Sequence, residues 1–348
     1  MAFIKNRNYI FKSIFLYAFL LLMISIIIKP NTARQGAVEG ILLCGRVIIP
    51  SLFPFTVCIL FIMKSLSGDY ASEVSKKEKI LIVIFSSIGG YPIGAKLLND
   101  GVKNKKISAK DAGLMLNYCV NAGPAFIIGA VGNGILNSKE LGYILFVSHI
   151  SASFLLSLFF AKRGSAKENS YRNKISPQNP IDTFVCSVSD ASLSVLSICS
   201  FVILFSVISA YCQFFSSFNT AFKYFSLFLE ITTGIQKTQN IYLISFLLGF
   251  GGLCIWCQIF SIGRLVGIKL WFFALFRILH GLFSSALTAL LIKLFGISLP
   301  CFSNSVNFSG NIFYSTPALS VSLISLGLIL AISLFSKKYT GNPIDDIV

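Results

Sequence analysis

The segment Ile80–Leu98, ILIVIFSSIGGYPIGAKLL, decides the fold, because it is apolar enough for a membrane helix yet is interrupted near its centre. Glycine adopts positive φ readily and proline has no N–H, so a continuous helix through Gly89-Gly90-Tyr91-Pro92 is disfavoured. A break at membrane depth leaves backbone amides and carbonyls available as ligands. The segment therefore predicts a broken membrane helix, with a plain kink as the alternative. Its candidate substrate-binding residues are Gly90, Tyr91, Pro92, Gly94 and Lys96.

Basic residues flank this segment on both sides, in two clusters. The clusters are Lys76, Lys77 and Lys79 before it, and Lys103, Lys105, Lys106 and Lys110 after it. Because cytoplasmic loops are enriched in Lys and Arg, a simple crossing would leave one cluster outside the cell. We therefore expect a re-entrant hairpin that keeps both clusters in the cytoplasm.

The composition places the rest of the chain in a membrane as well. Of the 348 residues, 55% are hydrophobic and 12% are charged, with a mean hydropathy of +0.79; an ordinary globular chain has about 25% charged residues. These values exclude a water-soluble enzyme and indicate a multi-pass cell-membrane protein surrounded by the lipid bilayer. The net charge of +16 is typical of cytoplasmic loops, so no nucleic acid is expected as a partner.

We predict an all-α polytopic protein with about eight spans and additional re-entrant or broken helices. The predicted spans are Ser13–Ile28, Ile41–Met63, Leu114–Leu136, Leu141–Ala161, Ala191–Cys212, Ile241–Ile262, Trp271–Ile292 and Thr316–Phe335. The remaining apolar segment, Phe214–Ile235, is interpreted as re-entrant or interfacial, because a full crossing would invert the basic residues that follow it. Both termini are then cytoplasmic.

One long polar connection divides the chain into two halves. The predicted parts are an N-terminal anchor helix (1–36), a first repeat (37–161), a cytoplasmic basic loop (162–184), a second repeat (185–295), and a C-terminal span with a cytoplasmic tail (296–348). Ile88-Gly89-Gly90 is similar to Phe250-Gly251-Gly252, and His149 and His280 each stand 13 positions before a lysine. Under the predicted topology the two histidine helices run in opposite directions, so the halves are predicted to be inverted repeats. Chance similarity of apolar sequence is the alternative.

Polar side chains within apolar segments add further candidates. Asn117 and Asn121 are four residues apart, so on a helix they share a face, directly before the Gly123-Pro124 break. Glu230 is a lone carboxylate in an apolar stretch, and an acid at membrane depth indicates a functional site, although on the outer surface it would be a solvated charge. The candidates for substrate binding from these segments are Asn117, Asn121, Gly123, Pro124, His149, Glu230, Thr232, Thr233 and His280.

Three of these motifs together resemble a known family. They are Gly-Tyr-Pro-Ile-Gly-Ala-Lys from Gly90, Asn-Ala-Gly-Pro-Ala-Phe-Ile-Ile-Gly-Ala-Val-Gly from Asn121, and Leu-Glu-Ile-Thr-Thr-Gly from Leu229, followed by Leu-Leu-Gly-Phe-Gly-Gly from Leu247. The chain resembles, over about Gly45 to Phe295, the sporulation integral membrane proteins of the YlbJ type, which belong to the nucleoside-recognition or Gate domain proteins. The resemblance implies two Gate-type repeats and a role in spore formation in endospore-forming bacteria.

The sequence therefore predicts a transporter of a small polar solute. The resemblance makes a nucleoside-like molecule a candidate for this solute. The alternative is a non-transporting membrane scaffold or assembly factor for the spore envelope. We do not expect an enzyme, because no nucleophilic side chain paired with a general base can be recognised. We expect no cofactor and no metal, because Cys254 and Cys257 have CxxC spacing without a second pair. Assembly into a homo-oligomer is left open.

Overall fold

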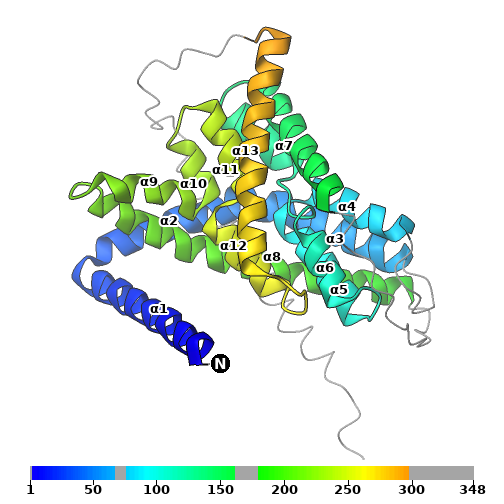
Figure 1. Cartoon of the computed structure of the whole chain (residues 1–348), viewed down its shortest axis with the longest axis horizontal. Helices are drawn as coiled ribbons and strands as arrows, with labels where there is room; N and C mark the ends of the chain where they lie inside the picture. The colour runs from blue at the N-terminus through cyan, green and yellow to red at the C-terminus, as the bar shows by residue number, and fades with distance from the viewer. Residues whose placement is uncertain (1, 67–75, 161–178, 298–348) are drawn as a thin grey trace, which may run out of the picture.

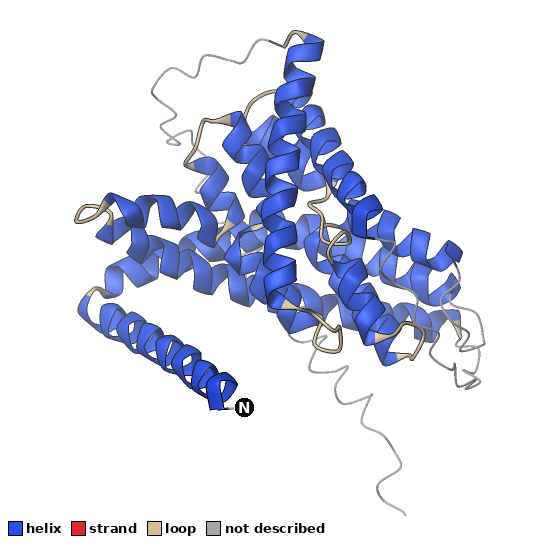
Figure 2. Ribbon diagram, viewed as in Figure 1, coloured by secondary structure: helices blue, strands red, loops and turns tan. Residues whose placement is uncertain are grey.

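The computed structural model describes residues 2–66, 76–160 and 179–297, and all regular secondary structure within these ranges is helical (Figures 1 and 2). The N-terminal half contains α1 (Ala2–Ile28), α2 (Pro30–Leu43), the π-helix η1 (Cys44–Ile48), α3 (Ile49–Leu66), α4 (Lys76–Gly89), α5 (Tyr91–Lys103), α6 (Ala109–Leu116), the π-helix η2 (Ala125–Ile135) and α7 (Lys139–Phe160). The C-terminal half contains α8 (Pro180–Phe215), α9 (Thr220–Leu229), α10 (Ile231–Gln236), α11 (Ile241–Phe250), α12 (Gly252–Ile262) and α13 (Leu270–Phe295). The predicted all-α class is confirmed.

Within the described residues, which contain seven of the eight predicted spans, four helical stretches are long and apolar enough to cross a membrane. They are Lys139–Leu158, Pro180–Ser216, Ile241–Ile262 and Leu270–Phe295. A fifth span arises if Lys12–Ile28 and Pro30–Ile48, which are bent by 106°, are counted together. The predicted span Thr316–Phe335 lies outside the described residues, as do positions 162–178 of the predicted basic loop.

Two predicted boundaries are wrong, each for a local reason. Leu114–Leu136 is not one span, since α6 ends at Leu116 and η2 begins only at Ala125. The predicted loop 162–184 overlaps a helix, because the Asn179 side chain accepts the Ile181 N–H at 3.2 Å and Pro180 takes the first helical position, so α8 begins there.

The order of elements repeats in the two halves. A long helix (α3), two interrupted pairs (α4 with α5, α6 with η2) and a second long helix (α7) are followed by α8, two interrupted pairs (α9 with α10, α11 with α12) and α13. The interruptions lie at Gly90, at residues 117–123, at Glu230 and at Gly251. In this order the Gly90 break of the first half corresponds to the Glu230 break of the second half. Sequence similarity alone had paired the Gly90 break with Gly251.

Long helices form the framework that holds these interruptions. α8 packs along α2 and α3, while α13 packs against both α7 and α11 (Figure 1). The contact of α11 with α13 is close, because a Cβ on Gly249 would lie only 2.5 Å from the Gly281 Cα. Beside it the Ser245 hydroxyl is hydrogen bonded to those of Ser284 at 2.9 Å and Thr288 at 2.8 Å. Such small and hydroxyl-bearing residues are typical of helix contacts in membranes.

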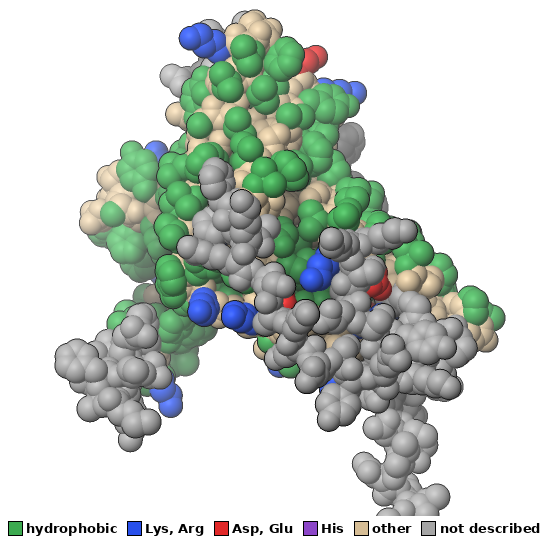
Figure 3. Space-filling view, turned by 45° about the vertical axis from the view of Figure 1, so that its right-hand side comes forward, with side chains coloured by type: hydrophobic (Ala, Val, Ile, Leu, Met, Phe, Trp, Pro, Cys, Tyr) green, Lys and Arg blue, Asp and Glu red, His purple; other side chains and the backbone are tan. Residues whose placement is uncertain are grey.

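The described surface is that of a membrane protein. Exposed apolar side chains cover much of the face in Figure 3, and on α13 they include Trp271, Leu282 and Leu290. α1 lies apart from the bundle in Figure 1, and nearly all its large apolar side chains from Ile14 to Ile28 are exposed. These surfaces suit contact with lipid rather than water.

Candidate functional site

A pocket lies where three of the helix interruptions meet. Its cavity volume is about 80 Å³, enough for several water molecules or a small polar group. The interruptions contribute Gly89, Gly90, Tyr91, Pro92, Gly123, Glu230, Ile231 and Thr232. Its apolar walls come from η1, α3, α8 and α12 and include Leu52, Phe55, Ile198, Val202 and Ile255, and Gln258 adds an amide. Residues far apart in sequence therefore share one cavity.

Glu230 supplies a buried carboxylate to this pocket. Its side chain is 2% exposed and caps α10, with Oε1 accepting the Thr232 N–H at 3.1 Å and Oε2 accepting the Thr233 N–H at 2.8 Å. These bonds satisfy amides that the start of a helix leaves free. Within the described part of the chain no cation lies within ion-pair distance of it, so the carboxylate retains acceptor capacity beside the cavity.

The Gly90 break places Tyr91 and Pro92 in the pocket wall. Gly90 has φ of +89°, a conformation that disfavours any side chain, and Pro92 is the second residue of α5, where its fixed φ suits the first turn. The Tyr91 hydroxyl donates to the Leu248 carbonyl at 2.7 Å, so it ties α5 to α11 of the other half. The break is thus held to both halves while its backbone lines the pocket.

The predicted helical face of Asn117 and Asn121 does not exist. Both residues lie in the non-helical segment 117–123, and their Nδ2 groups donate to nearby carbonyls, Asn117 to Gly113 and Asn121 to Tyr118. Their Oδ1 atoms are buried without a hydrogen-bond partner in the described structure. Neither residue lines the pocket; they support the segment whose end, Gly123, does.

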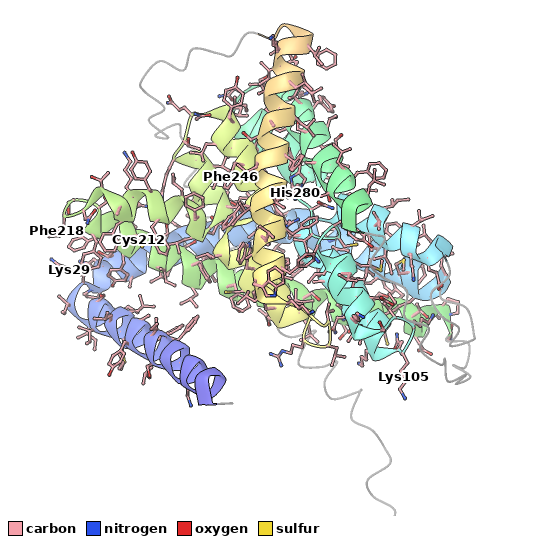
Figure 4. All side chains as sticks on the ribbon, viewed as in Figure 1. Lys29, Lys105, Cys212, Phe218, Phe246 and His280 are labelled. Carbon is pink, nitrogen blue, oxygen red and sulfur yellow. The ribbon has the colours of Figure 1, made fainter. Side chains whose placement is uncertain are left out.

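His149 and His280 also lie outside the pocket lining, in a second polar cluster. Both are fully buried, and their rings are 4.5 Å apart at the contact of α7 with α13, where Figure 4 labels His280. His149 and Arg277 form hydrogen bonds to the segment 117–122. His280 instead lies within hydrogen-bond distance of the His149 carbonyl and of Arg277. The geometry indicates support of the backbone rather than direct contact with a pocket ligand.

Lys96 and Gly94 have roles away from the pocket. The Lys96 ammonium pairs with Asp100 at 3.1 Å and approaches Asp190 at 3.9 Å, in a cluster that Lys64 completes. Gly94 packs against the backbone of Cys119, where a Cβ would overlap the Cys119 carbonyl oxygen. Pro124 and Thr233 flank lining residues without lining the pocket themselves.

Sequence reasoning missed two contributors to this region, Gln258 and the apolar wall around Phe55, because neither carries a local signal of a site. Arg277 does carry a signal, because an arginine at membrane depth is costly and indicates a functional or structural partner. In the structure its partners are the backbone carbonyls of Asn117 and Val120.

The comparisons with known proteins agree with this membrane architecture. No family model and no solved structure matches the chain. The chain is similar to the sporulation integral membrane protein YlbJ of Bacillus subtilis (strain 168), with 22% identity over 331 residues that cover 79% of this chain and 81% of that protein. Together with the apolar helices, this similarity defines an integral membrane protein. The resemblance to the YlbJ-type sporulation membrane proteins, which three motifs indicated, is confirmed.

Proposed function

We propose that this protein transports a small polar solute across a membrane during spore formation, and that the solute binds at the pocket between the helix interruptions. The supporting observation is that Gly90, Gly123 and Glu230, from three interrupted helices in two halves of the chain, line one cavity. In secondary transporters, discontinuous helices from two repeats meet in this way around the substrate. The spore-related role rests on the similarity to a protein named for sporulation.

The repeated order of elements supports the transport proposal. Each half carries two interrupted pairs between long helices, and the first interruption of each half, Gly90 or Glu230, reaches the pocket. We propose that the halves are inverted Gate-type repeats and that alternating access arises when one half moves against the other. In this arrangement α4 with α5 forms a re-entrant hairpin, since α4 and α5 pack against each other around the Gly90 break.

Solute uptake and spore yield test the proposed function together. Purified protein in liposomes is expected to take up at least one labelled polar solute from a panel that includes nucleosides. A deletion strain is expected to grow normally but to yield fewer heat-resistant spores. Normal spore yield would contradict the sporulation role. Reduced yield with no uptake of any solute would favour the scaffold alternative.

The proposed topology is tested with reporters fused after Gly164, Leu299 and Lys338. We expect cytoplasmic signals at Gly164 and Lys338 and an external signal at Leu299, because the basic clusters favour the cytoplasm. A reporter that scores as external at Gly164 would contradict the inverted-repeat proposal.

A further inference from the structure

In the non-helical segment 117–123 the carbonyls of Asn117 and Val120 accept no backbone hydrogen bond, although the N–H groups of residues 117–119 still donate to carbonyls of α6. At membrane depth there is little water to replace the missing bonds, so the protein must supply partners. Arg277 of α13 supplies two of these, since Nη1 donates to the Val120 carbonyl at 2.6 Å and Nη2 donates to the Asn117 carbonyl at 3.0 Å. The Arg277 side chain is fully buried. One planar guanidinium therefore holds two carbonyls of the unwound chain.

The two histidines extend this support into a larger hydrogen-bond network, in which His149 Nδ1 and Arg277 Nε are buried without a partner in the described structure. The Ala122 N–H donates to His149 Nε2 at 3.0 Å, and His280 Nε2 faces the His149 carbonyl at 2.9 Å. The neutral His149 ring therefore carries its proton on Nδ1, and the His280 ring carries its proton on Nε2. His280 Nδ1 is then free to accept from Arg277 Nη2, 2.9 Å away. Segment 117–122, α7 and α13 are thus linked through Arg277 and the histidine pair.

Arg277 does this without a carboxylate partner. No acidic side chain forms an ion pair with it among the residues that the structure describes. Its guanidinium lies 5.8 Å from the centre of the Phe273 ring and 5.5 Å from that of Phe276, within the range of cation–π attraction. The backbone carbonyls are therefore its main hydrogen-bond acceptors.

The held segment forms part of the pocket wall. Gly123 lines the pocket, and its backbone lies against the Gly90 break, because a Cβ on Gly123 would come within 2.7 Å of the Ile88 carbonyl oxygen. A displacement of residues 117–122 would accordingly move Gly123 and loosen the Gly90 wall.

We infer that Arg277 is a positioning residue for the pocket. It fixes the unwound segment, which ends at Gly123 and packs on the Gly90 break, and both of these contribute to the shape of the cavity. This inference rests on the proposed function, since the pocket is taken to be the solute site. Asn117 and Val120 supply the carbonyls through which Arg277 acts.

Alkylation of Cys119 by N-ethylmaleimide in membranes tests the inference. Cys119 is fully buried between the two anchored residues, so it is expected to be unreactive in the unchanged protein. Arg277→Gln should raise its modification rate by at least about tenfold, because loss of one or two hydrogen bonds corresponds to a factor of that order. Arg277→Lys should give an intermediate rate of modification, because an ammonium group cannot reproduce the two parallel hydrogen bonds of the planar guanidinium. Peptide mass spectrometry identifies Cys119 among the other cysteines.

Ser284→Ala is the matched control. Ser284 is buried on α13, and its hydroxyl bonds to Ser245 rather than to the segment 117–122, so Cys119 should stay protected. Protection of Cys119 in both Arg277 variants would overturn the inference, as would equal exposure in Ser284→Ala, which would indicate general loosening. If Arg277→Gln does not accumulate in membranes, the Cys119 modification rate of Arg277→Lys is compared with that of Ser284→Ala instead. Exposure of Cys119 together with absent uptake by the unchanged protein would refute the transport proposal while leaving the positioning role intact.

Discussion

Replacing Gly94 with alanine is expected to remove most of the protein from the membrane. An ideal Cβ at Gly94 would overlap the Cys119 carbonyl oxygen and lie 2.8 Å from its carbon. Both are backbone atoms in a buried segment, so no side-chain rotation relieves the overlap. Overpacked cores typically lose about 1–3 kcal/mol, occasionally more, and this direct backbone overlap belongs at the upper end. The amount of protein in membranes and the Tm of the purified protein measure the effect.

Gly129→Ala is the control for this prediction. Gly129 also lies in an apolar helical segment, but a Cβ there would meet nothing within 4 Å. Because alanine favours helix over glycine, this variant should accumulate normally, with an unchanged or slightly raised Tm. If Gly94→Ala matches Gly129→Ala in both measurements, the close approach of α5 to the segment around Cys119 is refuted.

Residue chemistry in the sequence was sufficient to predict the helix break at Gly90, which adopts φ of +89°, a value that glycine accepts and other residues resist. Gly251 adopts φ of +85° inside the predicted span Ile241–Ile262, where no break was predicted. These properties belong to the residue itself, so no knowledge of its neighbours in space is needed. The same reasoning correctly placed an interruption at Gly123-Pro124, although the span Leu114–Leu136, which was predicted to run through it, is not a continuous helix.

The extent of an interruption depends on distant residues and could not be predicted in this way. Asn117 and Asn121 were assigned to a helix because local spacing permits one. In the structure the chain is unwound from residue 117, and Arg277, which lies 157 residues beyond Val120, satisfies the released carbonyls. Such long-range compensation determines whether an unwound segment is stable, and no local pattern reveals it.

Lys96 and Glu230, two charged candidates for substrate binding, differ in how much of their surroundings the sequence could reveal. Lys96 has Asp100 four positions later on the same helix, a spacing that favours an ion pair and was visible in the sequence. Glu230 has no such neighbour, and its place beside Gly90 and Gly123 follows from the packing of helices far apart in sequence. The ion pair of Lys96 could thus be predicted from local spacing, whereas the pocket itself required the fold.

Glu230→Gln is expected to abolish function while most of the protein remains in the membrane. The amide keeps one acceptor for the α10 N–H groups but turns a donor toward the other, so a loss of about 1–2 kcal/mol in stability is expected from the weakened cap. The pocket, however, loses the negative charge of its buried carboxylate. Heat-resistant spore yield should therefore fall to the level of the deletion strain, with the amount of membrane protein only modestly reduced.

Asn240→Ala distinguishes the loss of a helix cap from the loss of charge in the pocket. The Asn240 side chain accepts the Tyr242 N–H at 2.9 Å and the Leu243 N–H at 3.2 Å, the same pattern that Glu230 forms at α10, but Asn240 is exposed and lines no part of the pocket. Its loss should cost about 1 kcal/mol in stability and leave spore yield unchanged. Glu230→Asp keeps both charge and capping ability, so it should accumulate better than Glu230→Gln and retain part of the spore yield. If Glu230→Gln and Asn240→Ala reduce spore yield equally, the carboxylate of Glu230 acts only as a helix cap, because loss of charge from the pocket then has no effect of its own.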